Sequence, residues 1–451
     1  MRVYRSPGRQ RYAAAIVHSP GTAPLLMSSL NLKRLGPCLF AIAIDAMGFG
    51  LVYPMMSVIF GDPHTSLLAP DTSTTLRNFY LGLGYGVYPL CMFFGSSLMG
   101  ELSDGYGRRK ILLLCVFGLS LSYFLMALGV LWLSVGLLLF GRGLSGLMAG
   151  CQGIAQAAIT DMSTPENKAL NMSFMSLAFS VGVIVGPVLG GVASDQRIAP
   201  IFGHETPFLL VGALALACGV WMWVSYRNTV APSERHRVDV LLPLRVMHEA
   251  VRHKAVAYLS VVFFLMQIGY GLYLQTIMML LQTRFHYGSA QLGLFSGAIG
   301  VCFVFGLLCV VRLMLRVWSV IDIAKTGLLV AGIAQVLSSL LPYEAALWAL
   351  AALVGCFDMV AYTTMYTAFS DAVTEDRQGW ALGVAGSVMA VAWVVTGFLT
   401  NLLPVLGETG LLLIGGIGFL LSFLMMRAYG RKRRMTRDNA GADSPAPGVT
   451  G

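Results

Sequence analysis

The hydrophobic residues of this chain are gathered into long runs that carry almost no charge. Each run has about the 20 residues that a helix needs to cross the hydrocarbon layer of a bilayer. Because helices satisfy their own backbone hydrogen bonds in lipid, the pattern predicts an all-α membrane protein. We expect twelve transmembrane helices, at 36–60, 79–100, 110–132, 134–160, 169–193, 206–226, 256–282, 290–311, 318–341, 344–370, 380–403 and 408–428.

The two halves of the chain repeat each other. Leu81-Gly82-Leu83 is matched by Leu292-Gly293-Leu294, and Gly48-Phe49-Gly50-Leu51 by Gly269-Tyr270-Gly271-Leu272. Repeats of six spans predict two pseudo-symmetric six-helix bundles, with a substrate site between them near the membrane midplane. The expected units are an N-terminal cytoplasmic extension, a first bundle, a cytoplasmic linker, a second bundle and a basic disordered tail, at 1–35, 36–226, 227–255, 256–428 and 429–451.

Charge placement supports a membrane topology. Only 11% of the residues are charged, whereas about a quarter are charged in soluble domains. The net charge of +9 could indicate nucleic-acid binding, but with both termini in the cytoplasm only Arg77, Arg197 and Arg284 lie outside. That bias follows the positive-inside rule. It predicts an integral protein of a bacterial inner (plasma) membrane that contacts lipid and binds no nucleic acid.

Several chemistries lack support in the sequence. The eight cysteines fall inside apolar runs without CxxC spacing, so neither a zinc site nor a disulfide framework is indicated. No P-loop pattern is present, which argues against ATP as the energy source. No constellation of nucleophile and base is visible, and we expect no enzymatic activity, no cofactor and no metal site.

The segment from Gly100 to Lys110 reads Gly-Glu-Leu-Ser-Asp-Gly-Tyr-Gly-Arg-Arg-Lys and follows the second span. Its glycines allow a tight turn, and its aspartate can accept hydrogen bonds from arginine. A simple cytoplasmic loop is the alternative, but the segment resembles the signature loop of the major facilitator superfamily. That resemblance implies a conformational switch that locks the two halves in the outward-facing state, built on Gly100, Asp104, Gly107, Arg108 and Arg109. The region around Arg312 in the second half lacks the pattern, so we expect a one-sided lock.

The fifth span contains a glycine pattern, GxxxGPxxGG. Glycines four residues apart give a flat helix face for close packing, and the proline bends the helix. The pattern is similar to the antiporter motif of proton-coupled exporters in the superfamily, although helix packing alone is the alternative. Its residues are Gly182, Gly186, Pro187, Gly190 and Gly191.

Three charged residues lie deep within predicted spans: Asp45, Arg142 and Asp358. Charges at such depth face protein or water and mark functional sites more often than lipid contacts. The stretch from Ile44 to Pro54 resembles the first span of tetracycline-type exporters. A carboxyl group there can be neutral when dry and ionised when wet, which suits proton coupling. We expect Asp45 near Arg142, with Asp358 facing them from the other bundle. The alternative for each is a structural polar anchor.

The resemblance to tetracycline-type drug:proton antiporters implies a secondary active transporter that functions as a monomer. We expect proton-coupled efflux of a small molecule by alternating access. The alternatives are a proton-coupled importer of a nutrient or siderophore, and a non-transporting receptor or scaffold. Possible substrate-binding residues are the polar-tipped side chains Tyr85, Gln152, Gln267, Tyr270, Tyr362 and Trp393.

Overall fold

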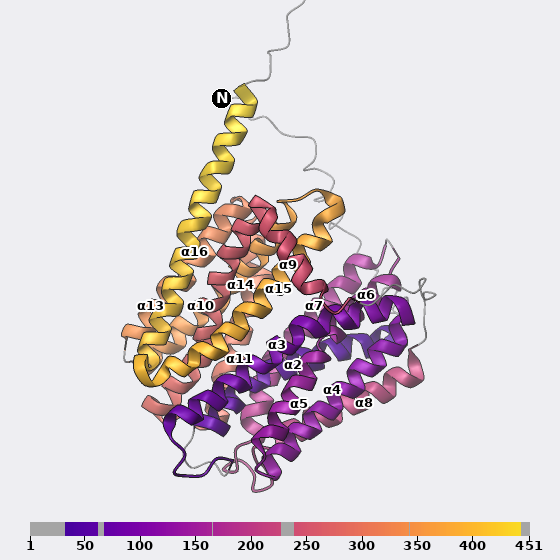
Figure 1. The fold of residues 1–451 in the computed structure, drawn as a ribbon, viewed down its shortest axis with the longest axis vertical. Coiled ribbons are helices and arrows are strands. Elements are labelled where there is room, and N and C mark those ends of the chain that lie inside the picture. The colour runs from indigo at the N-terminus through magenta and orange to yellow at the C-terminus, as the bar shows by residue number, and fades with distance from the viewer. Residues whose placement is uncertain (1–31, 62–66, 165, 227–238, 342, 443–451) are drawn as a thin grey trace, which may run out of the picture.

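The computed structural model describes residues 32–61, 67–164, 166–226, 239–341 and 343–442 of the chain. Over these residues the all-α prediction is confirmed, and Figure 1 shows the helices arranged in two bundles. The first bundle contains α2 (Leu32–Gly61), α3 (Thr74–Tyr106), α4 (Arg108–Leu131), α5 (Val135–Leu147), α6 (Gly150–Asp161), α7 (Lys168–Ala193) and α8 (Thr206–Ser225). The second contains α10 (Lys254–Phe285), α11 (Ser289–Phe305), α12 (Val311–Met314), α13 (Val320–Leu340), α14 (Glu344–Ser370), α15 (Gln378–Leu399) and α16 (Leu403–Ala442).

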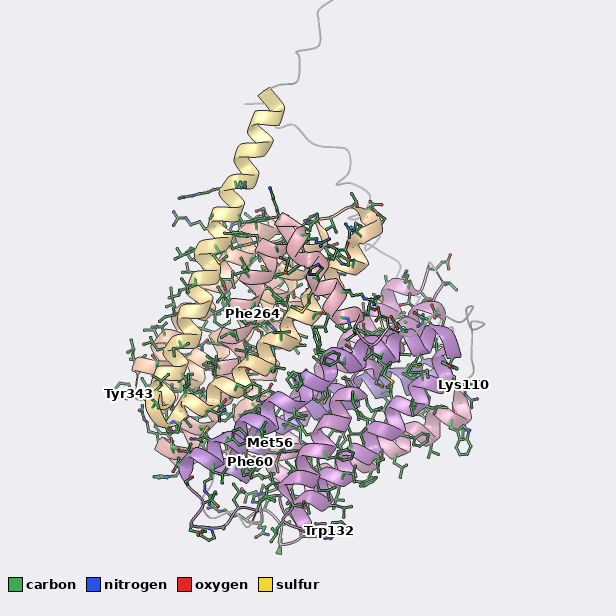
Figure 2. All side chains as sticks on the ribbon, in the orientation of Figure 1. Met56, Phe60, Lys110, Trp132, Phe264 and Tyr343 are labelled. Carbon is green, nitrogen blue, oxygen red and sulfur yellow. The ribbon has the colours of Figure 1, made fainter. Side chains whose placement is uncertain are left out.

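The outer surface suits a bilayer. Large apolar side chains are exposed over both bundles, for example Phe140 and Leu294, whereas a soluble monomer rarely exposes wide apolar patches. Trp132 and Tyr343 stand exposed at helix ends, where aromatic side chains favour the membrane interface. Figure 2 shows Lys110 and Trp132 at opposite ends of α4. A charged end and an aromatic end fit a helix that crosses the membrane.

Eleven segments within the described ranges are long and apolar enough to span a membrane, one fewer than predicted. The last segment, Glu375–Lys432, has 58 residues, and as one straight helix it would be about 87 Å long, far beyond the ~30 Å hydrocarbon layer. Gly407 divides it with φ 65° and ψ 174°, a left-handed conformation that glycine adopts without steric cost. The predicted spans 380–403 and 408–428 lie on either side of this break.

Two predicted spans are interrupted. The span at 134–160 is two helices, α5 and α6, which meet at Met148 and Ala149. Near this junction α5 packs closely on α3, where a Cβ at Gly146 would lie 2.4 Å from the Tyr88 carbonyl oxygen. The span at 290–311 contains a π-helical turn at Gly306–Val310 between α11 and α12. A hydropathy profile of the sequence detects neither interruption, because the chain remains helical on both sides of each one.

The linker and tail contain more helix than the sequence predicted. Within 227–255, α9 (Leu242–Arg252) packs on α15 and α10. The disorder predicted for 429–451 is wrong over its first part, because α16 continues to Ala442. Tyr429 stacks on Tyr258 of α10 with ring centroids 5.8 Å apart, which holds this part of α16 on the bundle. Residues 443–451, and residues 1–31 of the predicted N-terminal extension, lie outside the described part.

The two bundles touch most extensively through two helix pairs, α7 with α11 and α3 with α15, and α2 also contacts α10 and α11. Both contacts are close at one end. A Cβ at Gly191 would lie 2.7 Å from Cα of Gly293, and a Cβ at Gly82 would lie 2.5 Å from the carbonyl oxygen of Gly397. Gly82 lies near the first residue of α3, whereas the signature segment, 100–110, includes the end of that helix at Tyr106 and its turn at Gly107. The bundles are therefore pressed together at the end opposite the loop.

Candidate functional site

Arg142 is a fully buried cation in α5, with 2% of its surface exposed. Its Nε donates to the carbonyl oxygen of Gly84 at 3.3 Å, and its guanidinium lies 4.4 Å from the ring centroid of Tyr88. A desolvated arginine over an aromatic face gains about 2 kcal/mol. Nη1 has no hydrogen-bond partner among the described residues. The side chain is held firmly in place while keeping one donor to offer.

Asp45 lies buried in α2, but no ion pair joins it to Arg142 in the described part of the chain. Two tyrosines, Tyr88 and Tyr123, are within electrostatic reach of both charges. Tyr123 also approaches α2 directly, since a Cβ at Gly48 would collide with its hydroxyl oxygen. The acid and the arginine therefore share a tyrosine-lined environment without direct contact.

Asp358 occupies the second bundle, buried in α14 with 1% of its surface exposed. Its Oδ1 has no hydrogen-bond partner among the residues described. Tyr270 and Tyr362 lie within electrostatic reach, and Tyr362 packs on Tyr366 with ring centroids 4.7 Å apart. An unpartnered buried oxygen is uncommon in native proteins and calls for a ligand, an ion or water.

Aromatic rings from both bundles meet between these charges. Trp393 of α15 has its ring centroid 4.9 Å from Phe49 and 5.9 Å from Tyr53, both on α2, and 6.3 Å from Tyr270 of α10. Tyr85 of α3 stacks on Tyr53 at 5.4 Å and donates its hydroxyl to the Tyr53 carbonyl at 3.1 Å. We call Phe49, Tyr53, Tyr85, Tyr88, Tyr270 and Trp393 the interbundle aromatic cluster.

Phe49 and Tyr53 were not among the residues predicted from the sequence to bind substrate. They stand four and eight residues after Asp45, so all three share one face of α2. That spacing was the available signal. Of the residues that were predicted, Tyr85, Tyr270 and Trp393 lie in the aromatic cluster.

The predicted glutamines are placed differently from each other. Gln267 is buried in α10, and its Oε1 has no hydrogen-bond partner within the described ranges. Gln152 is half-buried on α6. The indole Nε1 of Trp393 in the aromatic cluster is likewise buried, with no hydrogen-bond partner in the described part of the chain. Polar atoms without partners thus occur on both bundles, and they could bind a polar solute.

The glycine pattern of the fifth span leaves two faces of α7 without protruding side chains. Gly182 and Gly186 face α2, where a Cβ would lie 2.3 Å from the carbonyl oxygens of Ala43 and Met47 respectively. Gly190 continues this face with a Cβ position 3.0 Å from the side chain of Leu51. Side chains at these positions would force the helices apart, so the motif allows α7 and α2 to pack backbone to backbone.

The end of the same motif contacts the other bundle. The Pro187 carbonyl oxygen lies 2.5 Å from a Cβ placed at Gly293 of α11, and Gly191 is packed on that same residue. The ring of Pro187 meanwhile abuts Gly50 of α2. A single helix therefore connects the Asp45 helix with the second bundle, and a shift of either partner must be accommodated by α7.

The signature loop is joined to its own bundle by charges. Arg108 Nη1 lies 2.5 Å from Asp104 Oδ1, and Arg108 Nε donates to Asp161 Oδ2 at 3.2 Å. Gly107 makes the turn with φ 96°, where a side chain would be strained. Arg109 Nη2 donates to the Trp223 carbonyl oxygen of α8 at 2.6 Å. Around Gly100 there is open space, with no atom within 4 Å of a Cβ placed there.

Two contacts link the linker segment to both bundles. The backbone N–H of Asp239 donates to Glu101 Oε2 at 2.7 Å, beside the signature loop. Glu249 of α9 forms an ion pair with Arg377 at the start of α15. These contacts were not predicted, because spacing along the sequence does not show that the linker turns back over the bundles. Metal binding has no visible basis in the described residues, where no three His, Cys, Asp or Glu side chains are grouped.

The family model of the Major Facilitator Superfamily matches residues 35–397. The chain is 28% identical over 266 residues to the tetracycline resistance protein, class C, of Escherichia coli, covering 58% of this chain and 62% of that protein. It is 26% identical to the class B protein of Escherichia coli, covering 57% and 60%. The chain thus matches less than two thirds of the length of these relatives.

Solved structures share the fold at low sequence identity. The human organic anion transporter MFSD10 (TETRAN) superposes with a TM-score of 0.64 at 20% identity, covering 87% of this chain and 99% of that one. A D-xylose–proton symporter gives a TM-score of 0.65 at 14% identity, covering 87% and 96%. The two helical bundles, the signature loop and the family match over most of the sequence agree, and the chain belongs to the Major Facilitator Superfamily.

Proposed function

We propose that this protein is a secondary active transporter that exports a small molecule in exchange for protons by alternating access. The observation that carries the proposal is the interbundle aromatic cluster with the buried charges beside it. Trp393 of one bundle packs on Phe49 and Tyr53 of the other, while Arg142 and Asp358 each keep a polar atom with no hydrogen-bond partner among the described residues. Such a group of residues supports a solute site that forms and opens as the bundles move.

A receptor or scaffold of the same fold would not need these unpartnered groups. An unsatisfied buried polar atom costs about 1–3 kcal/mol, and more when it is charged. Packing alone would favour apolar residues at the positions of Arg142 and Asp358. Their burial without full hydrogen bonding supports transient partners, such as a substrate, water or a proton, during a transport cycle.

Asp45 is the group we assign to proton coupling, with Arg142 as the fixed positive charge nearby. A carboxyl group that alternates between water and a dry protein environment takes up and releases a proton. Asp45 belongs to α2, which packs on α7 through Gly182 and Gly186. Since α7 also contacts α11 of the other bundle, and α2 itself contacts α10 and α11, movement between the bundles reaches the surroundings of Asp45.

The export direction is supported by two observations. The glycine pattern of α7 resembles the antiporter motif, and the curated relatives include tetracycline resistance proteins at 26–28% identity.

The close contacts at the end opposite the signature loop support a state closed at that face, with Asp104 paired to Arg108 of its own bundle. We propose that these residues, with Gly100, Gly107 and Arg109, form the switch, and that 36–226 and 256–428 are the moving units.

The aromatic lining favours a planar, amphiphilic solute, and we assign Tyr85, Tyr270, Tyr362, Gln152, Gln267 and Trp393 to its binding.

We further propose that the protein works as a monomer in the inner membrane with both termini in the cytoplasm. Cysteine tags at positions 30 and 440 should then resist an impermeant reagent in intact cells, whereas a tag at position 65 should react.

Purified protein reconstituted in liposomes gives the direct test. A pH gradient is imposed, and uptake of radiolabelled tetracycline, together with a panel of aromatic drugs, siderophores and sugars, is measured in both gradient directions. We expect at least one amphiphilic compound to accumulate against its concentration gradient in exchange for protons. Accumulation only when solute and protons move in the same direction would show an importer, and saturable binding without movement of any compound would show a receptor.

A further inference from the structure

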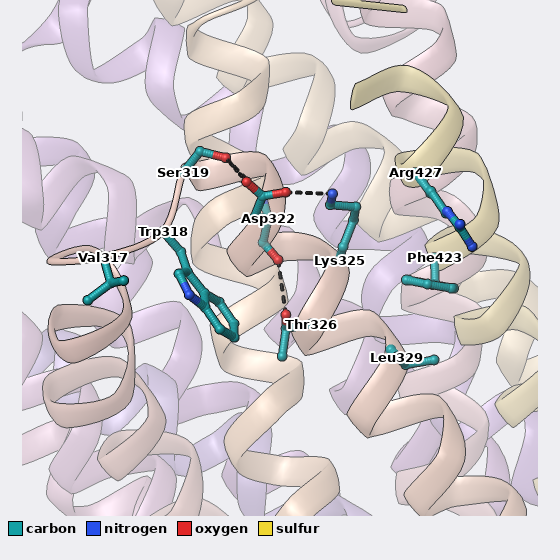
Figure 3. A pocket seen from close by; sticks show the side chains of 9 residues that line it. All are labelled: Val317, Trp318, Ser319, Asp322, Lys325, Thr326, Leu329, Phe423 and Arg427. Carbon is teal, nitrogen blue, oxygen red and sulfur yellow. Dashed lines mark hydrogen bonds and ion pairs between the residues drawn. The ribbon is translucent and has the colours of Figure 1, made fainter. Parts of the chain in front are cut away.

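A groove between α13 and α16 lies away from the proposed transport site. It has a volume of about 500 Å³ and is open to the outside. Figure 3 shows it between Trp318 and Asp322 on one side and Phe423 and Arg427 on the other, with Lys325 in the middle. Phe423 and Arg427 are four residues apart and therefore share one face of α16.

The acidic group in the groove is already neutralised. Lys325 Nζ lies 2.5 Å from Asp322 Oδ1, and the hydroxyl of Ser319 donates to Oδ2 at 2.6 Å. Ser319 also caps the start of α13, since its hydroxyl oxygen accepts a hydrogen bond from the backbone N–H of Asp322 at 3.2 Å. The carboxylate thus holds the local structure and leaves no net negative charge in the groove.

The groove also contains an arginine whose positive charge is not neutralised by any described residue. Arg427 is exposed, and no ion pair or hydrogen bond to it occurs among the residues that the structure describes. Lys325 uses one of the three donors of its ammonium group on Asp322. Arg316 is exposed just before the groove, and Arg431 one turn beyond Arg427. The groove therefore has a net positive charge and several free donors.

The remaining lining is apolar and lies where a membrane interface would be. Trp318 is 47% exposed, and tryptophan favours the level of lipid headgroups. Leu329 and Phe423 line the groove deeper along the helices. Basic pockets between transmembrane helices on the cytoplasmic side are suited to anionic headgroups. A free anion in water would gain nothing from the apolar part.

We propose that this groove binds an anionic phospholipid. Its phosphate accepts hydrogen bonds from Arg427 and Lys325, and its acyl chains lie along Phe423 and Leu329. The charge complementarity favours anionic over zwitterionic headgroups, because the single carboxylate of the groove already has its partners. The site does not depend on the transport function, and it would be occupied while the bundles move.

Native mass spectrometry of the purified protein tests the proposal, with phosphatidylglycerol, phosphatidylcholine and inorganic phosphate added in separate titrations. We expect a tightly bound phosphatidylglycerol on the wild type. Arg427→Gln should weaken it by about 10- to 100-fold, since a lost charge-assisted hydrogen bond removes ~1.5–3 kcal/mol. The matched control is Arg252→Gln, which removes an exposed positive charge at the end of α9 and should leave binding unchanged.

A second variant, Thr326→Trp, fills the groove without changing its charge and should displace the same lipid. Circular dichroism and size-exclusion profiles confirm that each variant is folded. Equal losses in Arg427→Gln and Arg252→Gln would show a non-specific charge effect and overturn the proposal. Equal binding of phosphatidylcholine, or displacement of the lipid by inorganic phosphate at its own concentration, would overturn it as well.

Discussion

The two bundles bury their deepest charges in different ways. Arg142 of the first bundle has a carbonyl oxygen at 3.3 Å and a tyrosine ring at 4.4 Å, although its Nη1 has no hydrogen-bond partner among the described residues. Asp358 of the second bundle has an oxygen without any hydrogen-bond partner in the described part of the chain. A buried charge with partners can remain in place through a cycle, whereas one without partners is more costly until something binds it. The first bundle thus supplies a fixed charge, and the second a group that needs a ligand.

The two bundles also differ in the charges of their corresponding loops, the one between α3 and α4 and the one around α12. In the first bundle, Asp104, Arg108 and Asp161 form a connected charge network around the turn at Gly107. In the second, the equivalent region has a π-helical turn and the short α12, and Arg312 and Arg316 are exposed and form no ion pair with any described residue. Two bundles with a shared helical plan therefore differ in their charged residues, and we assign control of the cycle to the first.

The largest effect should follow removal of the fixed charge. Arg142→Met introduces an unbranched apolar side chain, and the protein should fold, because burying an unpaired charge is itself costly. Transport should fall about a hundredfold, since the cation–π contact and hydrogen bond together are worth ~3 kcal/mol. Initial rates of substrate flux in liposomes measure this.

Arg142→Lys is the matched control for charge. It keeps the cation but loses the planar contact with Tyr88, and we expect a rate between those of the wild type and Arg142→Met. If both variants transport at the wild-type rate, Arg142 has a structural role only, and the contrast with Asp358 loses its functional meaning.

Asp45→Asn should separate proton coupling from the movement of solute across the membrane. The amide has the shape of the carboxyl group but cannot release a proton, so accumulation driven by a pH gradient should disappear. Downhill exchange should survive in part, because the aromatic cluster and Arg142 are unchanged. Parallel measurements of driven and downhill flux in liposomes distinguish the two. Continued accumulation by the variant would place the coupling group elsewhere.

Asp358→Asn should weaken substrate binding about tenfold, as expected for the loss of one charge-assisted hydrogen bond of ~1.4 kcal/mol. The protein should be at least as stable as the wild type, because a buried amide is less costly than a buried unpartnered carboxylate. Calorimetric titration gives the dissociation constant, and a thermal melt gives the stability. A large loss of thermal stability would show that Asp358 is a structural anchor, contrary to the comparison above.

Much of this architecture could be predicted from the sequence, because hydrophobic length and glycine spacing act locally. The start and end of α14 agree with the predicted span 344–370, whereas the predicted loop at 100–110 is helical except for the turn at Gly107. Contacts between segments could not be predicted in the same way. Phe49 and Tyr53 meet Trp393 from the other end of the chain, and Asp45 and Arg142 are separated by tyrosines that no spacing rule identifies.

The smallest effect should come from the loop, where the comparison between bundles is most direct. Asp104→Asn removes the negative charge beside Arg108, and turnover should slow about fivefold, since ~1 kcal/mol lost from one of two states changes their ratio by that factor. The protein should fold normally, because the Asp104 side chain is 55% exposed.

The matched variant in the second bundle is Arg316→Gln. It removes an exposed charge for which no ion pair is found in the described residues, and it should transport at the wild-type rate. Turnover numbers for both variants under the same gradient decide the point. Equal slowing in the two would mean that either loop controls the cycle, and the switch would then not be one-sided.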